Sequence, residues 1–302
     1  MRVLLTNDDG IRAPGIVALH KALTDPPRPT QPIAETVWPI APLTVQSATG
    51  HGITFSEPLM VSDANVSDAM QGLAVDGRPA DCVKLALSTL WPQRFGEGSR
   101  PDLCISGMNA GANCGVNVIY SGTVAAAIES AFLGVPSIAV SLHLGRGRVM
   151  WDIAARHARR AIDKVLASGL LAEHSCININ VPRCEEPIPD DEESRKRMMR
   201  ERREAGLPTL DSAGMPEQGG DNDEPPIVVC PMNTHGIVDR FEPRESPMGA
   251  PYYWSASHGL DFHATDEGTD VERLFARCIT VTPLTYDLTD HAMLEAWAKK
   301  LG

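Results

Sequence analysis

Residues 1–23, MRVLLTNDDGIRAPGIVALHKAL, decide the fold class, because they place a buried strand, a tight turn and a helix in immediate succession. The apolar run VLL (residues 3–5) ends at a polar cluster and a glycine, which is typical of a strand buried on both faces. Pro14 then stands at a suitable first helical position, ahead of apolar residues at helical spacing. Asp8 and Asp9 are therefore predicted to lie in a strand-to-helix loop, where open α/β sheets bind ligands.

The rest of the chain alternates strand-like and helix-like patterns in the same way. The predicted strands are residues 3–5, 35–42, 102–107, 137–142, 176–182 and 278–284, and the predicted helices are 14–23, 79–90, 122–134, 151–167 and 290–301. Such alternation predicts an α/β fold with a doubly wound, mostly parallel sheet and helices on both faces. Thr289 is a predicted cap for the terminal helix.

Composition excludes several classes of function. A chain of 302 residues, 43% of them hydrophobic, is long enough to bury a large core. Its net charge of −12 argues against a general binder of nucleic-acid duplexes or anionic membranes, which requires a basic surface. Seven cysteines without a C-x-x-C pair indicate reduced thiols. With no leader pattern and no apolar run near the roughly 18 residues of a membrane span, the sequence predicts a cytoplasmic protein.

A charged segment interrupts this pattern. Residues 184–226 are rich in charge, Pro and Gly, and thirteen acidic and six basic residues between Glu185 and Glu224 supply −7 of the net charge. A segment of this composition buries little apolar surface, although residues 190–204 favour a solvated helix. We therefore divide the chain into a core (1–183), an acidic insertion (184–226) and a strand and helix extension (227–302) that is expected to mediate oligomerisation.

Polar residues follow three successive predicted strands. Asp8 and Asp9 follow the first, Ser47 follows the second, and Asn109 follows the third. These loops share the carboxyl edge of a doubly wound sheet, so their side chains are expected to converge. Two carboxylates, a hydroxyl and an amide carbonyl suit Mg²⁺, Mn²⁺ or Ca²⁺ and leave coordination positions for water and substrate. The alternative for the acid pair alone is an Asx-rich turn that caps the following helix.

A second polar group stands at the expected start of the helix over residues 122–134. Ser121, Gly122 and Thr123 combine hydroxyls with free backbone N–H groups and the positive end of the helix dipole, which together favour an anion such as phosphate. Taken alone, the same three residues also fit a simple helix cap.

Five motifs in order carry a family resemblance: NDDG-x-x-APGI, AP-x-x-x-QS, DG-x-PADCV, SGMNAGANCG-x-x-x-IYSGTVAAA-E and GTDV…ITVTPL…DLT. Outside the acidic insertion, the chain resembles the survival protein E (SurE) 5′/3′-nucleotidase family. The resemblance implies a Rossmann-like core and a divalent-metal-dependent phosphomonoesterase that hydrolyses nucleoside monophosphates with one Mg²⁺ or Mn²⁺. It also implies a homodimer or homotetramer that exchanges carboxyl-terminal elements between subunits.

By matched position, the implied metal ligands are Asp8, Asp9, Ser47 and Asn109. Both aspartates are the expected catalytic residues; Asp9 is favoured as the general base or water-orienting group, but the sequence does not separate its role from that of Asp8. Asn113 and the loop Ser121, Gly122 and Thr123 are expected to bind the phosphate oxygens.

Two local departures from the family pattern, Ala48 and the tripeptide Gly77-Arg78-Pro79, affect the geometry of loops and leave every proposed ligand in place.

Other interpretations are weaker. A haloacid-dehalogenase-like phosphatase requires D-x-D, and the residue two after Asp8 is Gly10. A dinucleotide-dependent oxidoreductase requires G-x-G-x-x-G in the first turn, which here carries two repelling acids. A catalytically idle nucleotide sensor whose insertion docks a partner stays open.

Four histidines have ordinary explanations. His51 either contacts substrate or lies on the surface, His235 and His258 lie outside the motifs, and His291 is expected to support local packing.

Overall fold

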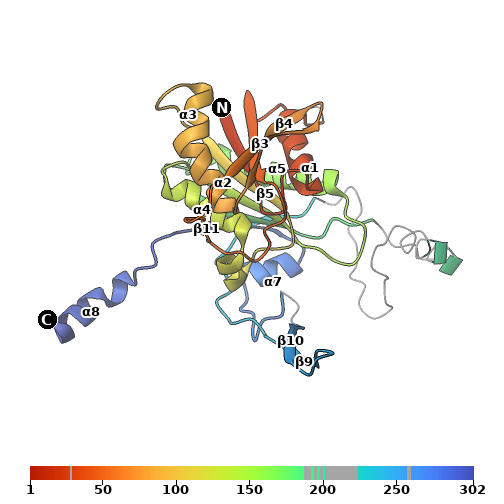
Figure 1. The fold of residues 1–302 in the computed structure, drawn as a ribbon, viewed down its shortest axis with the longest axis vertical. Coiled ribbons are helices and arrows are strands. Elements are labelled where there is room, and N and C mark those ends of the chain that lie inside the picture. Colours follow the sequence, from red (N-terminus) through yellow and green to blue (C-terminus); the bar gives the residue numbers. More distant parts are fainter. Residues whose placement is uncertain (28, 187–191, 194–195, 198–199, 201–223, 257–259) are drawn as a thin grey trace.

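The computed structural model describes residues 1–302 except 28, 187–191, 194–195, 198–199, 201–223 and 257–259. The described residues form a nine-stranded sheet with helices on both faces (Figure 1). In spatial order the strands are β3 (Met60–Ser67), β4 (Met70–Asp76), β2 (Thr36–Pro42), β1 (Arg2–Thr6), β5 (Leu103–Ala110), β6 (Ser137–Leu142), β7 (Cys176–Val181), β11 (Ile279–Leu284) and β8 (Ile227–Val229).

The central strands from β4 to β7 run parallel. Strand β3 is antiparallel to β4, and β11 is antiparallel to β7. The predicted α/β fold, with a Rossmann-like, doubly wound and mostly parallel sheet, is confirmed. Strands β8 and β11 come from residues 227–302, so part of this carboxyl-terminal segment extends the same sheet beyond β7.

Strand β1 buries both of its faces, as its unbroken apolar run predicts. Val3 and Leu5 pack in the cluster beneath α1 (Pro14–Thr24) and α5 (Trp151–Ala167). Leu4 packs in the opposite cluster with residues of α2 (Pro79–Leu85) and α4 (Gly122–Phe132). Successive side chains of a strand point to opposite faces, so one strand supports both helical layers.

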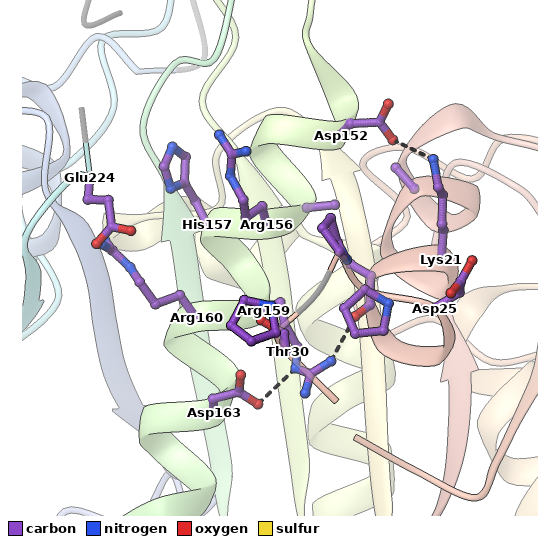
Figure 2. Close-up of a pocket in the computed structure, with 16 residues that line it drawn as sticks. Lys21, Asp25, Thr30, Asp152, Arg156, His157, Arg159, Arg160, Asp163 and Glu224 are labelled. Atoms are coloured by element: carbon purple, nitrogen blue, oxygen red, sulfur yellow. Dashed lines mark hydrogen bonds and ion pairs between the residues drawn. The ribbon is translucent and has the colours of Figure 1, made fainter. Parts of the chain in front are cut away.

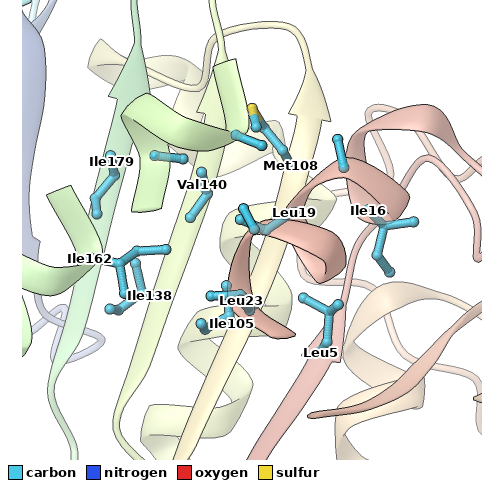
Figure 3. Close-up of a cluster of buried hydrophobic side chains, with 14 of the residues drawn as sticks. Leu5, Ile16, Leu19, Leu23, Ile105, Met108, Ile138, Val140, Ile162 and Ile179 are labelled. Atoms are coloured by element: carbon cyan, nitrogen blue, oxygen red, sulfur yellow. The ribbon is translucent and has the colours of Figure 1, made fainter. Parts of the chain in front are cut away.

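Helix α1 begins at Pro14, in agreement with the predicted first helical position. Its Ile16, Leu19 and Leu23 are fully buried, and Figure 3 shows the last two beside the sheet residue Ile105. Each such side chain contributes about 1.5–3 kcal/mol by leaving water. This packing holds the loop that precedes α1, which carries the two aspartates.

Several further elements complete the described fold. They are the π-helical turn η1 (Ala86–Leu90), α3 (Trp91–Phe95), the 3-10 helix η2 (Gly115–Tyr120), α7 (Asp270–Phe275), α8 (His291–Leu301), and a two-stranded sheet of β9 (Phe241–Glu245) and β10 (Pro251–Ser255). Helix α8 and this hairpin project from the body of the molecule (Figure 1). Asp290 caps α8 by accepting a hydrogen bond from the Met293 N–H at 3.2 Å, so the prediction that Thr289 caps this helix is wrong.

The charged helix predicted over residues 190–204 falls mostly outside the described residues. Glu192 and Lys196, which are described, form an i,i+4 ion pair with 2.7 Å between Oε1 and Nζ. No helix in the described parts of the chain combines the length and the apolar character needed to cross a bilayer.

Candidate active site

The three predicted ligand loops meet at one edge because β2, β1 and β5 are neighbours in the sheet. Asp8 and Asp9 follow β1, Ser47 follows β2, and Asn109 is the penultimate residue of β5. The parallel strands therefore deliver all four residues to the carboxyl edge, as the sequence predicts for a doubly wound sheet.

Two hydrogen bonds tie these loops together. The Gln46 N–H donates to the Asp8 carbonyl at 2.7 Å, which holds the Ser47 loop against the acid pair. The Ala110 N–H donates to Asp9 Oδ2 at 2.8 Å, which holds the end of β5 against the same pair.

The N-terminus of α4 also reaches this edge. The Thr123 hydroxyl donates a hydrogen bond to Asp8 Oδ1, although 115 residues separate the two in the sequence. Gly122 makes the close approach possible, because a Cβ there would lie 2.9 Å from Asp8 Cβ and 3.0 Å from Asp8 Oδ2. The acid pair and the predicted phosphate loop are thus in direct contact.

Burial dominates the electrostatics of the acid pair. Asp8 is 4% exposed, and burial raises its pKa to about 6, with the Thr123 hydrogen bond acting in the opposite direction and the neighbouring charge of Asp9 adding to the rise. Burial also raises the pKa of Asp9, against the hydrogen bond from Ala110. Two carboxylates that resist ionisation side by side favour a proton or a cation between them.

Ser47 and Asn109 present oxygen atoms at the same edge. Ser47 is exposed. Asn109 is 9% exposed, and its Nδ2 donates to the Gly111 carbonyl at 2.7 Å, which leaves Oδ1 as the atom that would bind a cation.

The donor set fits a hard cation. No group of three or more His, Cys, Asp and Glu side chains with metal-binding geometry occurs among the described residues. The candidate site instead has two carboxylates with one oxygen of each already hydrogen-bonded, supplemented by a hydroxyl and an amide. A site made only of oxygens, with few charges, suits Mg²⁺ or Mn²⁺ that keeps several water ligands.

Ser121 acts as the N-cap of α4. Its Oγ accepts a hydrogen bond from the Val124 N–H at 3.1 Å. The simple-cap interpretation therefore holds for Ser121, whereas the neighbouring Thr123 directs its hydroxyl to Asp8. The Val124 and Ala125 N–H groups are bonded to Ser121, so the N–H groups of Gly122 and Thr123 are the ones that would face an anion.

The hydrogen bonds of Asn113 go to residues of β6 and β7. Its Nδ2 donates to Ser141 Oγ at 2.8 Å, and its backbone N–H donates to Asn180 Oδ1 at 2.8 Å. The Asn113 carbonyl accepts from Asn178 Nδ2 at 2.7 Å and from Asn180 Nδ2 at 3.0 Å. The structure therefore places Asn113 in a buried polar network beside β6 and β7.

Several residues that hold the site were missed in the sequence analysis. Asn7 is fully buried, and its Nδ2 donates to the Gly10 carbonyl at 2.9 Å, which shapes the turn that contains the aspartates. Asn178 and Asn180 support Asn113 from β7. Their signal is the alternation in CININV (residues 176–181), because it gives one face of the strand a polar character.

Three of the four histidines singled out in the sequence each lie next to a carboxylate. His51 Nε2 lies 2.8 Å from Glu129 Oε2, and Lys84 Nζ lies 3.0 Å from Glu129 Oε1. His235 pairs with Asp266 at 3.0 Å and His291 with Asp287 at 2.7 Å, whereas His258 lies outside the described residues.

A separate cavity of about 570 Å³ lies between α1 and α5 (Figure 2). Arg159 Nε forms an ion pair with Asp163 at 2.8 Å, and Arg160 Nη1 forms one with Glu224 at 2.6 Å. None of the predicted site residues lines this cavity. We name it the α1–α5 cavity.

The fold and the site together define an α/β protein in which an acid pair faces a helix N-terminus at the carboxyl edge of a parallel sheet. A family model described as Survival protein SurE matches residues 3–203. The chain therefore belongs to the SurE family, which confirms the resemblance carried by its motifs.

Similar proteins cover almost the whole chain. The 5′-nucleotidase SurE of Heliobacterium modesticaldum is 37% identical over 303 residues, covering 100% of this chain and 92% of that protein. The 5′-nucleotidase SurE of Desulforudis audaxviator is 39% identical and covers 99% and 97%. The crystal structure of the SurE protein from Aquifex aeolicus superposes with a TM-score of 0.69 at 29% identity, covering 99% of both chains.

Proposed function

We propose that this protein is a divalent-metal-dependent phosphomonoesterase that hydrolyses nucleoside 5′- or 3′-monophosphates to nucleoside and phosphate. The observation that carries the proposal is the contact of Asp8 with Gly122 and Thr123, because it joins a candidate cation site to a candidate phosphate site. The relatives that bear the name 5′-nucleotidase support the same substrate class.

Asp8, Asp9, Ser47 and Asn109 would hold the cation, for which Mg²⁺ or Mn²⁺ is the proposed identity. When bound, such an ion neutralises the two carboxylates and polarises the phosphate ester. The raised pKa of Asp8 supports this assignment, since a buried carboxylate beside a second carboxylate is stabilised by positive charge.

The protein's own groups bind and orient the substrate. The N–H groups of Gly122 and Thr123 at the start of α4 would donate to the phosphate oxygens. The Thr123 hydroxyl, which here donates to Asp8, joins them only by releasing Asp8. Asp9 would accept a proton from the attacking water, whose oxygen bonds to phosphorus as the ester P–O bond to the nucleoside breaks. The nucleoside oxygen would take up a proton from solvent, and Asp9 would return its proton to solvent. A direct phosphate contact by Asn113 stays a prediction, and it requires the Asn113 amide to leave Ser141.

The test measures phosphate release from a panel of 5′- and 3′-monophosphates. The protein is dialysed against EDTA and assayed without metal, then with Mg²⁺ or Mn²⁺, and a small aryl phosphate serves as the substrate that lacks a base. We expect no turnover in EDTA and recovery with metal. Full activity in EDTA would refute the metal dependence. Tight metal-dependent nucleotide binding without phosphate release would instead favour the idle sensor.

A homodimer or homotetramer is part of this proposal. Apolar side chains are exposed on the two projecting elements, including Leu294 and Trp297 of α8 and Tyr253 and Trp254 of β10. Apolar surface on an isolated element favours burial against another subunit. Light scattering coupled to size exclusion measures the oligomeric state, and a monomer at micromolar concentration would contradict it.

A cytoplasmic location is also proposed. All seven cysteines are buried free thiols, and burial raises the pKa of each, for example that of Cys104 to about 12. Unpaired thiols are typical of proteins in a reducing compartment. Fractionation of cells that produce the protein tests the location, and recovery outside the cytoplasmic fraction would contradict it.

A further inference from the structure

Asp270 is a fully buried carboxylate at the first residue of α7, far in the sequence from the acid pair. Its Oδ2 accepts a hydrogen bond from the Gly115 N–H at 2.8 Å, across 155 residues of sequence. Its Oδ1 accepts from the N–H groups of Asn233 and Val271, each at 2.8 Å. Asp270 therefore joins the carboxyl-terminal segment to a loop at the carboxyl edge of the sheet, which carries the candidate active site and which we call the catalytic edge.

Gly115 lies near the start of the segment that links Asn113 to Ser121. It has a φ of +57° and begins η2, which leads directly into the N-cap of α4. A Cβ at Gly115 would lie 2.9 Å from the ring of Phe262 and 3.1 Å from the Asn233 carbonyl oxygen. The loop is thus in close contact with the carboxyl-terminal segment at the point where Asp270 binds it.

Packing reinforces this contact. Cys114, which precedes Gly115, is fully buried in a cluster with Val271 and Leu274 of α7. The other end of the loop is held by its own turn, where the Ser121 N–H donates to the Val118 carbonyl at 3.3 Å. Among the described hydrogen bonds of residues 114 to 116, the one that the Gly115 N–H donates to Asp270 is accepted by a carboxylate.

Asp270 acts only as an acceptor, and three N–H groups converge on it. Burial raises the pKa of Asp270, while the hydrogen bonds from Gly115, Asn233 and Val271 oppose the rise. A carboxylate satisfied by several backbone N–H groups fixes the positions of those groups, because each bond is charge-assisted and directional.

We infer that Asp270 is a positioning residue for the phosphate-binding groups of α4: it anchors Gly115 and thereby sets where η2 delivers Ser121, Gly122 and Thr123. This inference rests on the proposed function, since it assigns a phosphate to those groups. It also means that part of the carboxyl-terminal segment completes the catalytic edge within one chain.

The substitution Asp270→Asn tests the contact between Asp270 and Gly115 and barely changes the volume of the side chain. An asparagine keeps one acceptor oxygen, which satisfies two N–H groups when it faces Asn233 and Val271. Its NH₂ then faces the Gly115 N–H, and two donors repel each other. Glu267→Gln, an exposed carboxylate three residues earlier, is the matched control for loss of one negative charge.

Two measurements separate positioning from stability. Hydrogen exchange is followed for residues 113–121, and KM, kcat and inhibition by inorganic phosphate are measured well below the melting temperature. We expect Asp270→Asn to accelerate exchange in this segment at least ~10-fold and to raise both KM and the phosphate inhibition constant by roughly 10- to 100-fold. Glu267→Gln should match the wild type in each measurement.

A role in global stability alone gives a different result. It lowers the melting temperature and Vmax in proportion to the unfolded fraction, and it leaves KM, the phosphate inhibition constant and local exchange unchanged, which would overturn the inference. If the Asp270 variant does not fold, Gly115→Ala takes its place. Its added methyl group clashes with the Phe262 ring and so disrupts the same contact between Gly115 and Asp270. A wild-type chain that releases no phosphate refutes the proposed function, whereas exchange in residues 113–121 tests the Asp270 contact independently.

Discussion

The acid pair at the catalytic edge and the α1–α5 cavity use charge in opposite ways. In the cavity, Arg159 pairs with Asp163 and Arg160 pairs with Glu224, so charges of opposite sign satisfy each other. At the catalytic edge, Asp8 and Asp9 stand side by side, and the described hydrogen bonds to their side chains come from a hydroxyl and a backbone N–H.

The difference separates charges that hold the fold from charges that we propose bind a cation. Arg159 also donates to the Ala22 carbonyl at 2.8 Å and to the Gln31 carbonyl at 2.7 Å, which joins α5 to the end of α1 and the loop after it. Asp8, in contrast, has a pKa raised to about 6, so its ionised form costs stability in the absence of a cation. We therefore expect mutations in the two regions to have opposite effects on activity and stability.

The largest expected effect is that of Asp8→Asn. Asparagine keeps an acceptor for the Thr123 hydroxyl but removes one negative charge from the candidate cation site. We expect kcat/KM for nucleotide hydrolysis to fall at least ~100-fold, the size associated with disturbing a metal ligand. Steady-state rates across a titration of Mn²⁺ measure the loss, and a mild effect would place the metal elsewhere.

The same variant gives a pH-dependent stability effect. The raised pKa of Asp8 means that the folded state loses stability as pH rises from about 4 to about 6 and keeps that penalty above this window. Without metal at pH 7.5, Asp8→Asn should be more stable than the wild type by on the order of 1–3 kcal/mol, and the difference should vanish near pH 4. Urea denaturation at both pH values measures it. Equal stability at pH 7.5 would contradict the burial penalty.

The next effect is that of Thr123→Ala, which removes a hydroxyl from the contact between the cation site and the phosphate site. We expect kcat to fall roughly 10- to 1,000-fold if the hydroxyl acts mainly in the transition state. In the metal-free protein the variant should also raise the pKa of Asp8 further, because the hydrogen bond from Thr123 holds this pKa down. Thr123→Ser keeps the hydroxyl and is the matched control. Unchanged turnover with a lower melting temperature would show that Thr123 only stabilises the helix start.

A smaller effect, on stability alone, is expected from Arg159→Met in the α1–α5 cavity. The substitution leaves the Ala22 and Gln31 carbonyls without their donor, which costs about 1–3 kcal/mol of unfolding free energy. The value of kcat/KM should stay within about threefold of the wild type, because no candidate ligand lies in this cavity. Chemical denaturation and nucleotide hydrolysis, measured on the same preparation, check both parts. A large loss of activity in the folded variant would connect the two regions.

The smallest effect is expected from replacing residues 188–223, within the acidic insertion, by a Gly/Ser linker. This change retains Glu185, which accepts a hydrogen bond from the Gly147 N–H at 2.8 Å, and Glu224, which pairs with Arg160. A net charge of −7 over the active site would repel a phosphate monoester, so we predict that the insertion lies away from it. The value of kcat/KM for a small aryl phosphate should change less than about threefold, under ~1 kcal/mol. A collapse of activity with the oligomer intact would show that the insertion reaches the site.

Local pattern predicts the elements with a regular apolar period and misses several that lack one. Strand β1 and helix α1 follow from apolar runs at strand and helix spacing. Strand β3 was not predicted, because most of it is exposed and its sequence, MVSDANVS, carries little apolar periodicity. Strand β4, MQGLAVD, was also missed, because Gln71 and Gly72 interrupt its apolar residues. The predicted helix over residues 79–90 is interrupted after α2 by the π-helical turn η1, and the residue pattern did not predict this interruption.

The candidate site shows the same division. The sequence by itself determined the α/β class, the carboxyl edge as the place of the acid pair, and the oxygen character of its ligands, because strand and helix periods and loop chemistry are local properties. Only the tertiary structure decided that Thr123 binds Asp8, that burial raises the pKa of Asp8 to about 6, and that Asp270 holds Gly115. Burial and hydrogen bonding depend on which distant segments meet, and the contacts of Asp8 with Thr123 and of Gly115 with Asp270 span 115 and 155 residues.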